Sequence, residues 1–171
     1  MRRRRYSRVM STAPNTVRMR TADIDDAAML LDWRNDPVTR EMSLQSDVVP
    51  LTQHLRWMAS SLASDHRVLL IAEDPTTAEP VGMCRFDLEG RPPVAAEVSI
   101  NLAPPHRGRG LGVAVLSGGI RELARTHPEV RILTAVIRAG NAASIRLFAS
   151  AGFASTSAAD DVLTYTLGAD A

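Results

Sequence analysis

The stretch "PPHRGRGLG" (residues 104–112) carries three glycines at every second position, Gly108, Gly110 and Gly112, with an arginine before each of the first two. It follows the alternating apolar segment "AAEVSINLA" (95–103) and precedes the helix-like segment "VAVLSGGIRELA". Glycines at a strand-to-helix turn let the backbone approach a ligand closely and point successive N–H groups into one concavity. The positive end of the following helix adds to this effect, so the turn predicts a site for an anion such as a pyrophosphate.

Two common phosphate-binding motifs do not fit this turn. No lysine follows the glycines, which excludes a Walker loop, and Val113 stands where a dinucleotide fingerprint would need its third glycine. The pattern present is Arg107-x-x-Gly110-x-Gly112. Further along the chain it is followed by "NAASIRLFASAGF", which begins at Asn141. The turn and this later segment together form the pattern that has to be explained.

Composition limits the possible classes of protein. The chain has 171 residues, 45% of them hydrophobic and 23% charged, which is typical of one globular domain. We predict a disordered arginine-rich leader over residues 1–14 and a single domain over 15–171. Without the four arginines at positions 2–5 the net charge of +1 falls to about −3 (1 − 4), which argues against a nucleic-acid partner. The single cysteine, Cys84, excludes an internal disulfide and favours a cytoplasmic protein, and no apolar run is long enough for a membrane span.

Patterning along the chain predicts an α+β (mixed α/β) fold with one domain. The alternating segments predict strands at 16–20, 67–73, 80–88, 95–103 and 131–137, and a last hairpin formed by "FAS" and "DVLTYTL". Helical periodicity predicts helices within 22–36, 51–63, 110–127 and 141–152, the first with Ile24, Ala27, Ala28, Leu31 and Trp33 on its apolar face and the second capped by Thr52. We expect Pro37 to end the first helix and an irregular stretch to reach Pro50. This order predicts a mixed, mostly antiparallel sheet of about six or seven strands with helices on both faces.

The two motifs together resemble the Gcn5-related N-acetyltransferase (GNAT) superfamily, from "TVRMRTADIDDA" to the terminal hairpin. The resemblance implies acetyl coenzyme A as co-substrate, no metal, and a sheet splayed between its fourth and fifth strands. The pantetheine arm would enter this opening like a missing strand. The residues that the resemblance assigns to the co-substrate are Ile100, Leu102, Arg107, Gly108, Arg109, Gly110, Leu111, Gly112, Asn141, Ser144 and Phe148.

Four segments narrow the resemblance further. "LLDWRNDPVTREM", "LTQHLRWM", "VGMCRFD" and "AEVSINLAP" are similar to acetyltransferases of nucleotide-linked amino-sugars, of the pseudaminic-acid and spore-coat polysaccharide type. Protein N-terminal acetyltransferases of the ribosomal-protein type share parts of this pattern. The similarity implies that the primary amine of an amino-sugar or another small molecule attacks the acetyl group directly in a ternary complex. The protein is expected to be a monomer or a homodimer. Acetylation of protein N-termini is the alternative.

The resemblance implies a general base at Glu97, at the head of the strand that would bind the co-substrate. By alternation Glu97, Ser99 and Asn101 share one face, so a solvated strand residue is the other interpretation. Many relatives have a tyrosine at the place of Phe148 that protonates the leaving thiolate, which phenylalanine cannot do. Tyr165 is then a weak candidate for the acid, and an aromatic side chain packed on the sheet is the alternative for it.

The acceptor side is less constrained by the sequence. Arg34, Asn35, His54 and Arg85 are candidate substrate contacts, Arg85 for a phosphate, although helix capping and an Arg–Asp pair with Asp36 would also explain the first two. An amine of pKa about 8 is far cheaper to deprotonate at pH 7 than a lysine-like amine of about 10.4, which favours amino-sugars and peptide N-termini. Two other classes stay open: a non-catalytic acyl-CoA-binding module, suggested by Phe148, and an enzyme acting on macromolecules such as aminoacyl-tRNA. The lack of a basic stripe speaks against the second.

Overall fold

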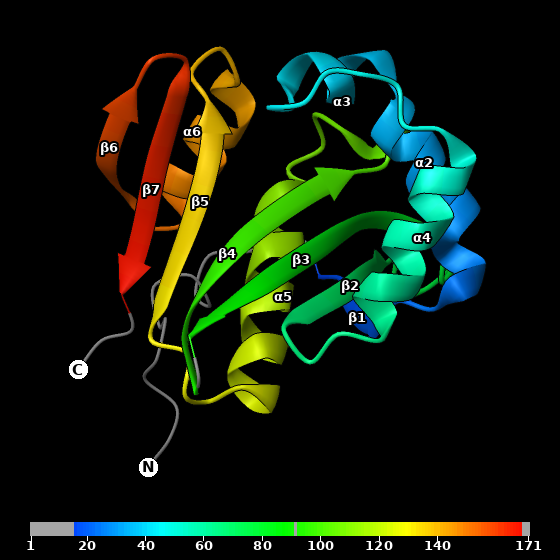
Figure 1. The fold of residues 1–171 in the computed structure, drawn as a ribbon, viewed down its shortest axis with the longest axis horizontal. Coiled ribbons are helices and arrows are strands. Elements are labelled where there is room, and N and C mark those ends of the chain that lie inside the picture. Colours follow the sequence, from blue (N-terminus) through cyan, green and yellow to red (C-terminus); the bar gives the residue numbers. More distant parts are fainter. Residues whose placement is uncertain (1–15, 91, 169–171) are drawn as a thin grey trace.

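A seven-stranded sheet runs through the molecule in the order β1-β2-β3-β4-β5-β7-β6 (Figure 1). The structure is a computed structural model that describes residues 16–90 and 92–168, so the predicted leader lies outside the described residues. The strands are β1 (Arg18–Thr21), β2 (Arg67–Glu73), β3 (Pro80–Gly90), β4 (Pro93–Leu102), β5 (Ile132–Arg138), β6 (Ala154–Ala159) and β7 (Val162–Gly168). All neighbours pair antiparallel except β4 and β5, which are parallel. The predicted fold class is confirmed.

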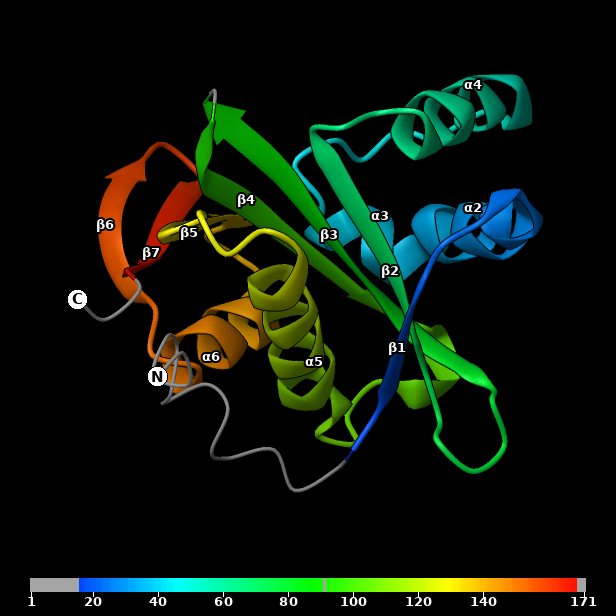
Figure 2. The same ribbon diagram turned by 90° about the horizontal axis from the view of Figure 1, so that it is seen from below.

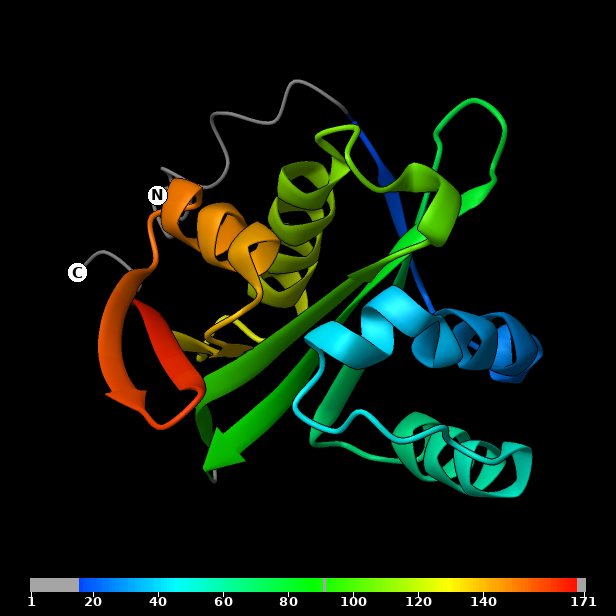
Figure 3. The same ribbon diagram turned by 90° about the horizontal axis from the view of Figure 1, so that it is seen from above.

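Helices cover both faces of the sheet, as the views in Figures 2 and 3 show. One face carries η1 (Ile24–Asp26), α2 (Ala27–Asn35), α3 (Pro37–Met42) and α4 (Leu51–Leu62). The other carries α5 (Leu111–Thr126) and α6 (Ala142–Ser150), and the short η2 (Pro104–His106) leads from β4 toward α5. None of the described helices is long and apolar enough to cross a membrane.

Three local predictions in the first part of the chain were wrong. Residues 37–42 are the helix α3 and not an irregular stretch, because proline is well tolerated in a first helical turn and the Asp36 carboxylate caps that turn by accepting from the Thr39 N–H at 3.1 Å. Thr52 does not cap α4, which begins at Leu51 after Pro50 without a side-chain cap.

The apolar face of the first helix was also misplaced. A 3-10 turn precedes α2 and shifts the helical phase, so Ile24 is 52% exposed and Ala28 is exposed. The buried face consists of Ala27, Leu30 and Trp33.

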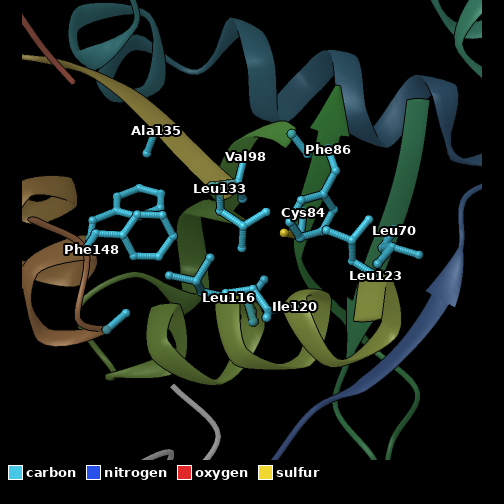
Figure 4. Packing of buried hydrophobic residues seen from close by; sticks show 14 of the residues in the cluster. Leu70, Cys84, Phe86, Val98, Leu116, Ile120, Leu123, Leu133, Ala135 and Phe148 are labelled. Atoms are coloured by element: carbon cyan, nitrogen blue, oxygen red, sulfur yellow. The ribbon is translucent and has the colours of Figure 1, made fainter. Parts of the chain in front are cut away.

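Each face of the sheet has its own hydrophobic core. The side chains that point to one face of the sheet pack against α5 and α6; they include Leu70, Cys84, Phe86, Val98 and Leu133 (Figure 4). The neighbouring residues along each strand point to the opposite face, where Leu69, Ile71 and Met83 pack with α2 and α4. On β3 and β4, residues at odd and at even positions therefore face opposite sides of the sheet. This decides which residues can reach the functional site.

The glycine at position 119 lets α5 approach β3 closely. A Cβ atom added to Gly119 would lie 2.6 Å from Cys84 Sγ and 3.1 Å from Cys84 Cβ, both fully buried in the core. We expect Gly119→Ala to destabilise the fold by about 1–2 kcal/mol, because overpacking costs more than the roughly 1 kcal/mol that alanine gains in a helix. Thermal unfolding should show a melting temperature lower by several degrees, at about 2–4 °C per kcal/mol for a chain of this size.

The neighbouring glycine supplies the control for this prediction. Gly118→Ala makes the same change in helix propensity, but its Cβ would meet the flexible Met19 side chain at 3.0 Å, which can move aside. We expect this variant to be near neutral. Equal melting temperatures for the two variants would contradict the close-approach explanation.

Candidate active site

The sheet opens between β4 and β5. The two strands pair only over Ala95, Ala96 and Glu97, and the last pair joins Glu97 to Thr134. Beyond it β4 continues to Leu102 and β5 to Arg138 without pairing to each other, and Figure 1 shows the strands diverging. The predicted splay between the fourth and fifth strands is therefore present, with Glu97 at its apex.

A cavity of about 1020 Å³ occupies this opening and extends under α2 and α4. Its walls come from the two diverging strands, the start of α5, one side of α6, the segment 42–49 and the inner sides of α2 and α4. The predicted site residues that line it are Arg34, His54, Arg85, Glu97, Ile100, Leu102, Arg107, Gly108, Gly110, Gly112, Asn141, Ser144 and Phe148.

The glycine turn, residues 107–112, ends in the N-terminus of the sixteen-residue helix α5. Gly110 is the N-cap with φ 74° and ψ 8°, a left-handed conformation, and no side chain caps the helix. Gly108 also has a positive φ of 72°, and a Cβ added there would meet nothing within 4 Å. The first amides of α5 thus face an open concavity, which fits an anionic group such as the pyrophosphate of coenzyme A.

The side chain of Arg107 is not directed at this concavity. Its guanidinium donates to Asp36 Oδ1 at 2.6 Å, to Thr39 Oγ1 at 2.7 Å and to the Leu102 carbonyl at 3.3 Å. The hydrogen bond from Arg107 holds the pKa of Asp36 below its usual value. Arg107 therefore acts as a bridge from the glycine turn to the α2–α3 corner.

Asn141 and Ser144 lie at the start of α6, on the β5 side of the opening. Asn141 is the N-cap of α6: its Oδ1 accepts from the Ser144 N–H at 3.1 Å, and its Nδ2 lies 3.5 Å from the Met42 carbonyl. The expected role of Asn141 as a pantetheine contact stays a prediction: its side chain caps α6, and the residue also lines the cavity. The Ser144 hydroxyl lines the cavity.

We therefore expect Asn141→Ala to act first on stability. Loss of a side-chain N-cap costs about 0.5–2 kcal/mol, and Asn141→Asp should restore most of it because aspartate caps equally well. Thermal unfolding of the two variants measures the difference. A melting temperature of Asn141→Ala equal to that of the wild type would show that the cap contributes nothing.

Glu97 lies on the face of β4 that is turned toward α2 and α4, because its neighbours Ala96 and Val98 are buried against α5. Burial raises the pKa of the Glu97 carboxyl; Arg85 opposes this rise, and Asp87 and Glu89 add to it. Directly opposite on β3 lies Asp87, which is bonded by Arg67 and lies 2.9 Å from Arg85 Nε. Within the described chain no side chain donates a hydrogen bond to Glu97, so its carboxylate is free to accept a proton.

His54 is buried, at 4% exposure. Its Nε2 lies 2.8 Å from the Ala27 carbonyl, which can only accept, so Nε2 carries the proton. Burial lowers the pKa of the imidazole, and the bond to Ala27 only partly opposes this. His54 is a neutral ring that stacks at 5.3 Å from Trp57 and lines the acceptor side of the cavity.

Four predicted site residues do not line the cavity: Asn35, Arg109, Leu111 and Tyr165. The amide of Asn35 is bonded to both the N–H and the carbonyl of Val49, and Leu111 packs against the core. Tyr165 pairs with the buried Ala135 and packs against the core on the α5–α6 face. Tyr165 does not line the cavity, so its role as the acid stays a prediction without geometric support.

Sequence reasoning missed several residues that shape the site. Thr39 and Asn101 join α3 to the end of β4, because the Thr39 hydroxyl lies 3.4 Å from Asn101 Oδ1 and Asn101 Nδ2 donates to the Trp33 carbonyl at 3.3 Å. Trp57 forms a wall of the cavity, with the Arg67 guanidinium 5.8 Å from its ring centroid. From the sequence we could predict only the face of the strand on which Asn101 lies, because the other contacts join distant parts of the chain.

The comparisons with known proteins agree with this geometry. The family described as the acetyltransferase (GNAT) domain matches residues 16–154. The chain belongs to the GNAT acetyltransferase family. The predicted N-acyltransferase class is thereby confirmed, whereas the amino-sugar subtype is not identified by this match. No curated protein is significantly similar to the chain in sequence.

Solved structures of other GNAT proteins share the fold. The ribosomal-protein-alanine N-acetyltransferase of Brucella melitensis is 28% identical, with a TM-score of 0.72 over 88% of this chain and 99% of its own. Salmonella typhimurium yncA, solved with its cofactor acetyl-CoA, is 26% identical, with a TM-score of 0.72 over 92% of this chain and 96% of its own. The spermidine N-acetyltransferase of Vibrio cholerae, solved with CoA and spermine, reaches a TM-score of 0.78 over 90% and 95% at 13% identity, which shows the fold alone.

Proposed function

We propose that this GNAT protein transfers the acetyl group of acetyl-CoA to a primary amine by direct attack in a ternary complex, with Glu97 as the general base. The observation that carries the proposal is the position of Glu97: a half-buried carboxylate that accepts no hydrogen bond from a side chain of the described residues, at the apex of the splay and in the wall of the cavity. A raised pKa brings a carboxylate closer to the pH at which it must accept a proton. In the reaction the amine nitrogen bonds to the acyl carbon, the C–S bond breaks, and the amine proton passes to Glu97.

The two ligands would enter from opposite sides of the sheet. The glycine turn at the start of α5 offers backbone amides to the phosphates of the donor. The backbone of β4 around Ile100 and Leu102 lines the opening into which an extended arm would fit. The acceptor amine would approach Glu97 from the side of α2 and α4, where His54 and Trp57 form the wall.

For the acceptor we propose a small-molecule amine, most specifically a nucleotide-linked amino-sugar. The support is the similarity of four sequence segments to that group of acetyltransferases, together with the cost of deprotonation, which favours amines less basic than lysine. Acetylation of a protein N-terminus is the second candidate, because the Brucella melitensis enzyme that acts on ribosomal-protein alanine is 28% identical to this chain.

A screen of amines with acetyl-CoA tests the proposal. It should include amino-sugars, amino-sugar nucleotides, amino acids and short peptides, scored by release of free thiol and by the mass of the product. We expect turnover with at least one small-molecule amine. Binding of acetyl-CoA without turnover on any amine would instead support a non-catalytic acyl-CoA-binding module, and turnover of peptides alone would support the second candidate.

A further inference from the structure

Two buried nitrogens in the wall of the cavity have no hydrogen-bond acceptor. Among the buried side-chain nitrogens and oxygens of residues 16–90 and 92–168, only Arg34 Nη1 and Arg85 Nε lack such a partner. Both arginines line the same cavity. A buried charged donor without an acceptor costs free energy, so the unbonded Nη1 marks Arg34 as a cation that the described residues do not neutralise, whereas Arg85 Nε has Asp87 Oδ2 2.9 Å away.

The contacts of each guanidinium leave one edge open. Arg34 Nη2 donates to the Gln45 carbonyl at 2.7 Å, which fixes the side chain while Nη1 stays unbonded. Arg85 Nε lies 2.9 Å from Asp87 Oδ2 in an ion pair, whereas its two Nη atoms have no hydrogen-bond partner among the described residues. Burial lowers the pKa of Arg34, and the neighbouring charge of Arg40 lowers it further against the opposing effect of Asp47. The positive charge of Arg34 is thus held in a place that disfavours it.

Both arginines belong to the acceptor side of the sheet. Arg85 stands between Cys84 and Phe86, which are buried against α5, so its side chain points to the opposite face, toward α2 and α4. Arg34 lies one helical turn after Leu30 on α2, and both line the cavity. The glycine turn, which would hold the phosphates of the donor, is at the start of α5. The two open guanidinium edges are therefore not explained by the donor.

The charge of the cavity wall also favours an anion. The described residues that line it include five arginines and a single carboxylate, that of Glu97. Arg107 and Arg138 are paired with Asp36 and Asp161, and Arg85 shares Asp87 with Arg67. Arg34 has no carboxylate within ion-pair distance among the described residues. A polycation such as the spermine held by the Vibrio cholerae enzyme would meet a wall of its own sign here.

We propose that the acceptor carries an oxyanion, a carboxylate or a phosphate, in addition to its amine, and that Arg34 and Arg85 bind this group. The planar guanidinium fork matches both kinds of oxyanion, and the bond is charge-assisted on both sides. With the oxyanion on these arginines the amine is directed toward Glu97, which lies diagonally across the β3–β4 pair from Arg85. The inference rests on the proposed N-acetyl transfer and names the class of its acceptor: an anionic amine.

Matched pairs of acceptors test this subsite. One pair is glucosamine 6-phosphate and glucosamine, and the other is an α-amino acid and its amide. We expect the acid-bearing member of at least one pair to have a kcat/KM at least tenfold higher, and the pair that discriminates identifies the oxyanion as phosphate or carboxylate. Arg34→Gln and Arg85→Gln should each lower the ratio of the two kcat/KM values about tenfold, because they raise KM for the acid-bearing member alone. Arg34→Lys and Arg85→Lys, which keep the charge, should retain part of it.

Arg56→Gln is the matched control, because Arg56 is exposed on α4, in the same layer, and does not line the cavity. It should leave the preference unchanged. Thermal unfolding of each variant separates a loss of fold from a loss of binding. Equal kcat/KM within both pairs, or variants that lower kcat/KM equally for both members, would overturn the inference.

Calorimetry separates this inference from the proposed function. Glucosamine 6-phosphate and the amino acid are titrated into protein saturated with coenzyme A, and each is compared with its acid-free partner. Tighter binding of an acid-bearing probe that is lost in Arg34→Gln and Arg85→Gln, without any acetylation, would uphold the subsite and reject the proposed transfer. Acetylation of both members without tighter binding of the acid-bearing one would uphold the transfer and reject the subsite.

Discussion

Glu97→Gln is expected to lower kcat/KM near pH 7 by roughly 100-fold or more, because a positioned base contributes about 100- to 10,000-fold and glutamine cannot accept the proton. Glutamine keeps the shape of the side chain, so the affinity for acetyl-CoA should persist. Raising the pH should recover part of the loss, since the amine then arrives deprotonated. Steady-state kinetics across pH with the best acceptor of the screen measures this.

Glu79→Gln is the control for the change of charge, since Glu79 is exposed before β3, does not line the cavity and is not among the charges that shift the pKa of Glu97. It should leave the kinetics close to those of the wild type. A Glu97→Gln variant with the activity and pH profile of the wild type would show that the amine loses its proton to water and that Glu97 is not a base.

The same substitution has an opposite effect on stability. Burial raises the pKa of Glu97 in the folded protein, so its protonated form is favoured by folding. That contribution is fully present below the unfolded pKa of about 4.3 and is lost as the pH rises through the higher folded value. At pH 7 the ionised Glu97 carboxylate therefore lowers the free energy of unfolding, and glutamine removes this effect. Glu97→Gln should melt at a higher temperature than the wild type at pH 7. The difference in melting temperature should disappear in acid. A gain that is independent of pH, or a loss at pH 7, would contradict the raised pKa.

Gly110→Val is expected to weaken binding of acetyl-CoA well over tenfold. Gly110 has φ 74°, a conformation in which a β-branched residue is strained by about 1–3 kcal/mol. The added side chain would also stand at the mouth of the concavity formed by the first amides of α5. Calorimetric titration with coenzyme A measures the loss.

Two further variants separate strain from obstruction. Gly110→Asn tolerates the left-handed conformation but still adds a side chain, so it should melt close to the wild type and yet bind coenzyme A weakly. Gly168→Val, at the end of β7, adds a side chain where the Cβ meets nothing within 4 Å and should bind normally. Unchanged affinity in Gly110→Val would show that the phosphates of the donor lie elsewhere.

The features that could be predicted from the sequence are those that depend on local patterns, such as strand alternation and glycine spacing. The alternation of β4 placed Glu97 and Asn101 on one face, and the glycine spacing indicated a turn between β4 and α5. The order of strands and helices, with the family resemblance, predicted the mixed sheet and the opening between β4 and β5. These signals depend only on residues close in the chain or on a motif spread over two neighbouring elements.

What could not be predicted depends on contacts between distant segments. Arg107 bonds to Asp36 and Thr39, and Asn35 bonds to Val49, and no pattern in the sequence marks either pair. Pro37 was interpreted only as the end of a helix, although proline also suits the first turn of the next one, as in α3. The open guanidinium edges of Arg34 and Arg85 are likewise visible only once burial is known.

The Arg107 bridge has a thermodynamic consequence. It joins the turn that would face the donor to the α2–α3 corner, whose Arg34 and Thr39 line the acceptor side of the cavity. Displacement of one wall is thereby transmitted to the other. Coupling of this kind is reciprocal: the factor by which the donor changes the affinity for the acceptor equals the factor by which the acceptor changes the affinity for the donor. We expect the Arg107 bridge to link the two halves of the cavity in free energy.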